Sequence, residues 1–380
     1  MKKSVAFNSV SGAFLAAFHL VTSFVICSQL DAADKAGGRP AGQITYKWTL
    51  FAGKAGEKGS ADGTSSEARF NGPAGIAVDA LGNLFVADCH NNAIRKITAK
   101  GEVSTFVGSG NQSGTQDGDR KTARLFHPVG LTIDGRGNLF VAEFVSSTIR
   151  KITPEGDVST IAGNGDKSAY GSADGRGREA RFFFPTGTAV DKAGNVYVGD
   201  TKNEIVRKIT PEGVVSTLAG KAEQWGYKDG IGSEARLSGP GGMVVGPDGV
   251  LYVADVGNCC IRKISPDGKV TTFVGRGGEP GEFSGRVDAV GDAARFDCPD
   301  DLVMDAAGII YVADTENHTI RRVFADGRVD TIGGKSGQPG ALDSLGGNLH
   351  FRPRGIAISA DGILYVTDQF NHIIYRGVPE

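Results

Sequence analysis

The 380-residue sequence lacks several features that would indicate a particular function. Its formal net charge is only −2 with the histidines neutral, and its lysines and arginines are spread among acidic residues. The absence of a basic stripe argues against nucleic acid as a partner. The sequence also contains no HExxH zinc motif, no serine nucleophile elbow, and no glycine loop that its turns do not already explain. The common sequence signatures of hydrolases and nucleotide-binding enzymes are therefore missing.

Long apolar runs are also scarce, and the one near the start of the chain is interrupted. Residues 13–27, AFLAAFHLVTSFVIC, follow a basic MKK and contain His19, Thr22 and Ser23. This run is too short and too polar for a membrane span, and its flanks fit a secretory signal. We expect a signal peptide at 1–32 and a flexible linker at 33–45. The mature chain would be exported to the periplasm or the extracellular space, without an integral membrane segment.

Glycine, by contrast, is abundant, with 57 residues, and it marks the turns of a long repeat. An acidic residue closes a short apolar run six times, at intervals of 54 to 59 residues, and an arginine follows seven residues later in the first five copies. The acidic positions are Asp88, Glu143, Asp200, Asp255, Asp314 and Asp368, and the arginines are Arg95, Arg150, Arg207, Arg262 and Arg321. This regularity indicates a repeat array.

Each copy contains four short runs rich in valine, isoleucine and aromatic residues, a composition that favours strands. In the first copy they lie at 75–79, 83–88, 93–98 and 103–108. The turns between them carry Gly where a positive φ is needed, or have Pro at the second position and Gly at the fourth, as in TPEG and SPDG, which suits a type I turn. Four antiparallel strands repeated around an axis form a propeller blade.

The sixth copy lacks its fourth run, and the missing run lies at the other end of the chain. WTLFAG at 48–53 matches VSTLAG at 215–220 and precedes the first blade. We predict an all-β, six-bladed propeller of four-stranded blades over 46–380, closed by this N-terminal strand and monomeric. The blades are predicted to start near 73, 128, 185, 240, 299 and 353.

The repeats resemble NHL repeats. GPAGIAVDALGNLFVADCHNNAIRKIT and GIIYVADTENHTIRRV carry the likeness, and Asn317-His318 and Asn371-His372 occupy the Asn-His element. The resemblance covers roughly 46–378 and implies a six-bladed propeller. It leaves the activity open, because the fold hosts binding modules, sensor domains, a metal-dependent amidating lyase and related gluconolactonase-type hydrolases.

Internal repetition separates scaffold from site. A residue found in every blade is explained by the blade, so the Asp/Arg pairs are expected to be structural, with each Asp capping the turn into the third strand. The recurring Ala-Arg-Phe or Ala-Arg-Leu segments, such as 68–70, are expected to place an apolar side chain over a blade junction. Inter-blade loops and the turns between the second and third strands should share one face, where binding is expected.

Departures from the repeat supply the candidate ligand-binding residues. The inner strand of each blade begins with Pro-x-Gly, but the fifth has Pro299-Asp300-Asp301, and the sixth places Arg354 at the position of Asp300. Two carboxylates beside a guanidinium could bind a cation, a sugar or another polar ligand, or they could form a plain rim ion pair. His127 and His350 should lie close to the inner strands and complete the candidate set: Asp300, Asp301, Arg354, His127 and His350.

No metal ligands are identifiable from the sequence, although a divalent cation, Ca²⁺ or Zn²⁺, remains open. Most histidines fall in repeat turns, and a zinc site needs three ligands that converge. After signal removal four cysteines remain, too few for a disulfide framework in a chain of this size. A disulfide of Cys259 or Cys260 with Cys298, or a vicinal bridge, is an alternative to free thiols, whereas Cys89 is expected to be unpaired.

Two functions remain open. The first is an exported, non-catalytic module that holds a protein, peptide or glycan on its long-loop face. The second is a metal-dependent lyase or lactonase-like hydrolase with an ion near the central channel. Convergence of the candidate residues on one centre would favour the enzyme, whereas simple pairing of Asp300 with Arg354 would favour binding.

Overall fold

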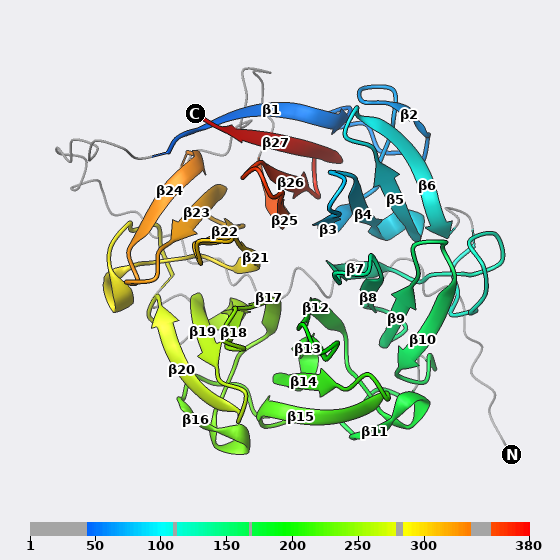
Figure 1. The fold of residues 1–380 in the computed structure, drawn as a ribbon. Helices are drawn as coiled ribbons and strands as arrows, with labels where there is room; N and C mark the ends of the chain where they lie inside the picture. Colours follow the sequence, from blue (N-terminus) through cyan, green and yellow to red (C-terminus); the bar gives the residue numbers. More distant parts are fainter. Residues whose placement is uncertain (1–43, 109–111, 167–168, 279–283, 336–350) are drawn as a thin grey trace, which may run out of the picture. The chain divides into compact units, whose positions relative to one another are not determined.

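The computed structural model describes residues 44–108, 112–166, 169–278, 284–335 and 351–380, which form a ring of six antiparallel sheets (Figure 1). The predicted signal peptide, His350 and most of the predicted linker lie outside these residues. The all-β, six-bladed propeller predicted from the repeat is confirmed.

Each blade runs from an inner strand at the channel to an outer strand at the rim. The inner strands are β3 (Pro73–Val78), β7 (Pro128–Ile133), β12 (Pro185–Val190), β17 (Pro240–Val245), β21 (Pro299–Met304) and β25 (Pro353–Ile358). The second strands are β4 (Leu84–Asp88), β8 (Leu139–Glu143), β13 (Val196–Asp200), β18 (Leu251–Asp255), β22 (Ile310–Asp314) and β26 (Leu364–Asp368).

The outer halves of the blades follow the same order. The third strands are β5 (Ala93–Ile97), β9 (Thr148–Ile152), β14 (Ile205–Ile209), β19 (Cys260–Ile264), β23 (Thr319–Val323) and β27 (Ile373–Pro379). The outer strands are β6 (Glu102–Gly108), β10 (Val158–Ala162), β15 (Val214–Gly220), β20 (Lys269–Val274), β24 (Val329–Gly334) and β1 (Tyr46–Gly53). Because β1 is the outer strand of the last blade, the two ends of the ring meet there.

The ring closes as predicted. β1 pairs antiparallel with β27, from Tyr46 opposite Pro379 to Gly53 opposite Ile373. Outside the strand bounds, Thr45, which the sequence places in the linker, still accepts a 2.8 Å hydrogen bond from the backbone of Glu380. β1 thus covers the edge of β27, which would otherwise be free to recruit another chain.

Three blades have one strand more than predicted. Two-residue strands from the inter-blade segments, β2 (Gly63–Thr64), β11 (Gly175–Arg176) and β16 (Gly230–Ile231), pair with β6, β15 and β20. Such short pairings have no hydrophobic alternation to reveal them in the sequence. They cover part of the outer edge of the blade.

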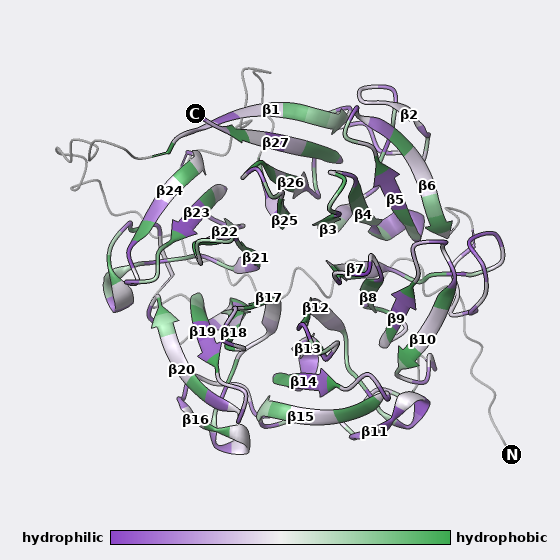
Figure 2. Cartoon of the chain, viewed as in Figure 1, coloured by the Kyte–Doolittle hydropathy of each residue, from purple (hydrophilic) through white to green (hydrophobic). Residues whose placement is uncertain are grey.

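The blade junctions are packed with the apolar residues that the repeat predicts. The Phe or Leu of each Ala-Arg-Phe/Leu segment, and Phe351 in the sixth blade, is at most 1% exposed: Phe70, Leu125, Phe182, Leu237, Phe296 and Phe351. Phe70 packs with residues of both the first and the last blade. Hydrophilic segments appear in the third strands β5, β9, β14, β19 and β23 (Figure 2), where the repeat places its arginines. These arginines are buried and need partners.

Candidate functional site

The repeated acids and arginines form a buried scaffold. Arg95 Nη1 donates to Asp88 Oδ2 at 2.9 Å, and its Nη2 donates to Asp62 Oδ1 at 2.7 Å. Asn91 Nδ2 also donates to Asp88 Oδ2, at 2.7 Å. Equivalent ion pairs hold blades two to five. The predicted Asp/Arg pairing is therefore confirmed, and a structural role alone explains why these residues recur in the repeat.

One detail of this prediction holds only in the sixth blade, where Asp368 Oδ1 accepts the backbone N–H of Asn371 in the following turn, at 3.1 Å, and is wrong in the first five. The remaining oxygen of Asp88 accepts the backbone N–H of Asn71, at 2.7 Å, rather than an amide of the turn into the third strand. The acids of blades two to five likewise accept an amide from the segment that precedes the inner strand. Each acid therefore fixes the approach to its own blade.

A second repeated contact joins neighbouring blades. The residue that ends the turn after each second strand has a positive φ, between 50° and 62°, in all six blades: Asn92, Ser147, Glu204, Cys259, His318 and His372. Its side chain binds the backbone just before the next inner strand. For example, Asn92 Oδ1 accepts His127 N at 3.0 Å, and His372 Nδ1 accepts Gly72 N at 3.1 Å. His318 Nδ1 contacts Phe351 O at 2.6 Å, so the two Asn-His elements act in blade docking.

Two further positions at each junction vary freely around the ring. One is the first residue of the turn after the second strand, and the other directly precedes the inner strand of the next blade. We call them the junction pair: Cys89/His127, Phe144/Phe184, Thr201/Gly239, Val256/Cys298, Thr315/Arg352 and Gln369/Gly72. Thr201 Oγ1 donates to Pro240 O at 2.9 Å and Thr315 Oγ1 to Pro353 O at 2.6 Å. The first position thus reaches the next inner strand, which places the junction pairs close to the channel on the long-loop face.

At the second junction the pair is aromatic. The Phe144 and Phe184 rings stack with centroids 4.4 Å apart and an interplanar angle of 14°. Tyr170 stacks on Phe183 at 4.9 Å, and Phe183 lies 4.9 Å from Phe184. All four rings are partly exposed. They form an aromatic shelf, defined as Phe144, Tyr170, Phe183 and Phe184.

Asp300 and Arg354 form an ion pair across the junction of the fifth and sixth blades. Arg354 Nη1 donates to Asp300 Oδ2 at 2.8 Å, and the side chains are 15% and 14% exposed. Simple pairing of these two residues is the outcome that we expected for a binding protein rather than for an enzyme.

Asp301 bridges the same junction from the position where the other five copies have glycine. Its carboxylate accepts Leu302 N at 2.9 Å and Ile356 N at 3.1 Å. A Cβ on Gly242 would lie 2.2 Å from Asp301 Oδ1, so the preceding blade makes room for this side chain. Burial among protein atoms raises the pKa of Asp301 to about 7, although the two backbone N–H groups favour its charged form.

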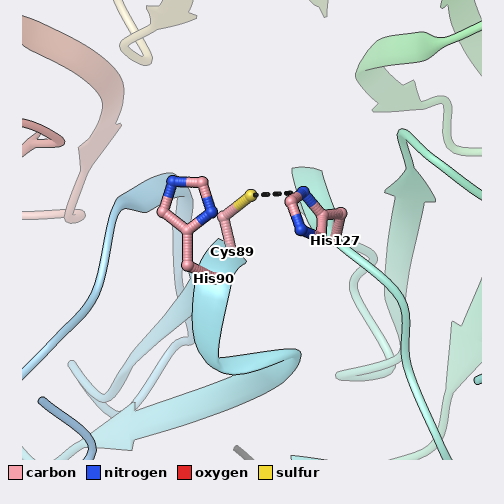
Figure 3. Close-up of side chains that lie close together, drawn as sticks. All are labelled: Cys89, His90 and His127. Carbon is pink, nitrogen blue, oxygen red and sulfur yellow. Dashed lines mark hydrogen bonds between the residues drawn. The ribbon is translucent and has the colours of Figure 1, made fainter. Parts of the chain in front are cut away.

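His127 takes part in a different cluster. Its Nδ1 lies 3.7 Å from Cys89 Sγ, and its ring centroid lies 5.3 Å from that of His90 (Figure 3). The potential ligand atoms of Cys89, His90 and His127 all lie within 4.8 Å of one another. Cys89 opens the 3-10 turn η1 (Cys89–Asn91), which positions the thiol and the first imidazole together.

Sequence reasoning identified only His127 of this cluster. His90 is one of the histidines that the sequence places in repeat turns, and Cys89 was expected to be unpaired; Cys89 is a free thiol. The sequence did contain a signal, because all three residues depart from the repeat. None of the other blades has Cys at the position of Cys89 or His at those of His90 and His127. Recognising it required knowing that these positions meet across a junction.

The remaining described cysteines are also free thiols. Cys259 and Cys298 are hydrogen bonded to each other across the junction of the fourth and fifth blades, and this contact lowers the pKa of Cys259 while it raises that of Cys298. Cys260 is fully buried in β19. Of the predicted pairings, the structure brings together Cys259 and Cys298.

The fold is a six-bladed β-propeller whose first five blades share one scaffold of buried ion pairs. The junction pairs on its long-loop face differ from blade to blade. The chain is an NHL-repeat propeller, and the sequence model of the NHL repeat matches residues 70–97, 237–264 and 296–323. No helix among the described residues combines the length and apolar character that a membrane crossing requires.

The chain is similar in sequence to parts of longer proteins. It is 28% identical to Protein SUPPRESSOR OF QUENCHING 1, chloroplastic, of Arabidopsis thaliana over 71% of this chain and 26% of that protein. It is 29% identical to NHL repeat-containing protein 2 of Bos taurus over 69% of this chain and 40% of that protein. The chain thus spans less than half the length of these relatives.

Solved structures share the fold. An auxiliary nutrient binding protein from Bacteroides ovatus superposes with a TM-score of 0.61 at 18% identity, over 89% of this chain and 78% of that chain. A gluconolactonase from Xanthomonas campestris gives a TM-score of 0.56 at 14% identity, over 90% of this chain and 99% of that chain. At these identities the likeness concerns architecture alone.

Proposed function

We propose that this protein is an exported binding propeller that holds a glycan, peptide or protein segment on its long-loop face. The aromatic shelf is the observation that carries the proposal. Its four partly exposed rings stack where the repeat requires no aromatic residue. Ring faces are a common way to hold sugar rings and apolar side chains, and aromatic pairs contribute on the order of 1 kcal/mol beyond the area they bury.

The charged groups near the channel support the same proposal. Asp300 and Arg354 satisfy each other at 2.8 Å while remaining partly exposed, so a polar ligand can exchange hydrogen bonds with both without leaving a buried charge unpaired. One structural neighbour, from Bacteroides ovatus, is described as an auxiliary nutrient binding protein. That description agrees with a binding role for this architecture.

The test is a screen of the purified chain on glycan and peptide arrays. The Phe184→Gly variant removes one ring of the shelf, and Gly is the residue of the first and fourth copies at this position. We expect it to weaken binding of any hit about 5–10-fold, the effect of about 1 kcal/mol. The control is Leu81→Ser, which changes an 81% exposed side chain in the turn between β3 and β4, on the opposite face. Equal loss in both variants would contradict a shelf-based site.

Export is proposed from residues 1–32, whose basic start and short apolar run suit a secretory signal. Expression of the full chain with N-terminal sequencing of the secreted or periplasmic product tests this. We expect a mature N-terminus between Cys27 and Ala33. Retention in the cytoplasm with Met1 or Lys2 at the N-terminus would contradict it.

A further inference from the structure

Three side chains that can bind a metal meet at the junction of the first and second blades. Cys89 and His90 come from the turn after β4, whereas His127 directly precedes β7, 38 residues after Cys89. The scaffold brings them together: His127 N donates to Asn92 Oδ1 at 3.0 Å, and Asn92 ends the turn that carries Cys89 and His90. The two halves of the cluster are therefore tied at the backbone.

The spacing suits a tetrahedral ion. With Zn–S of about 2.3 Å and Zn–N of about 2.0–2.1 Å, tetrahedral angles place sulfur and nitrogen roughly 3.6 Å apart. Cys89 Sγ and His127 Nδ1 are 3.7 Å apart. The third ligand lies within 4.8 Å of both, and His90 is exposed, so a rotation of its ring can close the remaining distance.

The segment that leads into the inner strand of the same blade leaves space for the His90 ring. The junction position before β3 is Gly72, and a Cβ there would lie 2.4 Å from His90 Cδ2. Gly72 also has a φ of +67°, which other residues adopt at a cost. Glycine at this position thus serves both the turn and the ring that lies over it.

The donor set selects the class of ion. A thiolate and two imidazoles suit zinc and similar borderline or soft ions, whereas calcium prefers oxygen ligands. Burial raises the pKa of the Cys89 thiol to about 12, and the positive charge of Arg354 opposes this rise. Binding therefore breaks the S–H bond: the sulfur keeps the electron pair and donates it to the ion, and the proton leaves to solvent.

We propose that Cys89, His90 and His127 bind one zinc-class ion through a sulfur and two imidazole nitrogens. The exposure of His90 leaves the fourth position of the ion facing solvent, where a water molecule completes the tetrahedron, as in zinc sites with three protein ligands. This site is separate from the aromatic shelf and does not depend on the proposed binding function.

The experiment is a titration of the chelator-treated full chain with Zn²⁺ and with Co²⁺ as a spectroscopic probe. We expect one ion per chain, a thiolate-to-cobalt charge-transfer band, and a rise in melting temperature with Zn²⁺, because an ion that binds only the folded state stabilises it. A one-to-one complex without the thiolate band would overturn the proposal, as would the absence of binding.

Substitutions taken from the other blades test each ligand with little risk to the fold. Cys89→Thr introduces the residue of blades three and five, whose hydroxyl bonds the next inner strand. His127→Gly introduces the residue of blades one and four, which accepts the φ of 50° found at His127. Both variants should melt like the wild type without metal. They should lose at least about 100-fold in zinc affinity, which is the largest effect expected from losing a residue that only hydrogen bonds to a ligand.

The matched control is Cys298→Gly, which makes the same kind of change at the junction of blades four and five. It removes a thiol that is hydrogen bonded to Cys259 but leaves the proposed ligands intact. We expect unchanged zinc affinity and an unchanged cobalt spectrum. Loss of the charge-transfer band in this variant, or its survival in Cys89→Thr, would place the thiolate elsewhere and overturn the assignment.

Discussion

At the scale of the residue, the buried arginines have a structural role and are not candidates for binding or catalysis. Arg207 Nη1 binds Asp200 at 2.9 Å and its Nη2 binds Asp174 at 2.7 Å, and both Arg207 and Asp200 have fully buried side chains. A charge pair of this kind need not stabilise a fold relative to apolar residues, but removal of one partner leaves the other charged and buried. This explains why the acid and the arginine occur together in each of the first five copies of the repeat.

Arg207→Met is expected to destabilise the fold by about 3–5 kcal/mol, because Asp200 then loses its counter-charge. The control is Arg178→Met, which breaks an ion pair with Asp117 whose side chains are 53% and 39% exposed and should cost less than about 1 kcal/mol. Urea unfolding followed by tryptophan fluorescence measures both. Equal destabilisation by the two substitutions would contradict the burial argument.

Asp301 gives a pH dependence with a definite sign. Its pKa of about 7 in the folded chain lies above the ordinary value of about 3.9. Between these values the folded chain retains a proton that the unfolded chain has released. The resulting stabilisation is complete below about pH 4 and is lost as the pH rises through about 7.

Asp301→Gly, which restores the residue of the other five copies, is expected to remove this pH-dependent contribution to the free energy of unfolding. The urea midpoint of the wild type should then fall more than that of the variant between about pH 5 and pH 8. Comparison of the two pH slopes, rather than of the midpoints, separates the effect from any change in packing. Parallel slopes would show that Asp301 ionises as an ordinary carboxyl group.

Sequence alone locates residues that break a repeat but not the partners they meet. Asp300 and Arg354 were predictable as a pair because both replace the middle residue of a Pro-x-Gly step. Cys89 and His127 occupy different positions of the repeat, and only the folded junction shows that these positions touch. His350 lies outside the described residues, so its candidacy stays a prediction.

At the scale of the element, strands were predictable and junction contacts were not. The turn chemistry and the alternation of apolar residues fix the four strands of each blade, whereas the two-residue strands β2, β11 and β16 have too little sequence to carry a pattern. The varied junction pairs make each of the six contacts chemically distinct. The contact between blades four and five contains two thiols.

We predict that oxidation joins Cys259 to Cys298 rather than to its sequence neighbour Cys260. Cys259 and Cys298 already share a hydrogen bond, whereas the Cys260 thiol is fully buried in β19 and its pKa is raised well above the usual value by that burial. Peptide mapping without reduction, after exposure to oxidised glutathione, identifies the bond. A vicinal Cys259–Cys260 disulfide, or no disulfide at all, would contradict the prediction.

At the scale of the whole molecule, the closed ring places residues from distant copies at shared junctions. The closing strand secures the last of these contacts: Trp48 Nε1 donates to Ile332 O at 3.1 Å, and a Cβ on Gly333 or Gly377 would lie 2.8 Å from the indole. Trp48 thus joins the fifth blade to the sixth from the N-terminal strand. Every junction pair depends on this closure, because loss of one outer strand exposes the apolar faces of two blades.

Removal of residues 1–53 is therefore expected to destabilise the ring, whereas removal of 1–43 retains β1 and serves as the control. Removal of 1–53 leaves the edge of β27 unpaired. It also removes the contacts that Trp48 and Tyr46 make with the fifth blade. An unpaired edge recruits other chains, so we expect a lower melting temperature and concentration-dependent association. Hydrogen exchange should show lost protection across β27 (Ile373–Pro379). If both truncated chains melt alike and remain monomeric, β1 does not close the propeller in solution, and the shared face assigned to the junction pairs loses its basis.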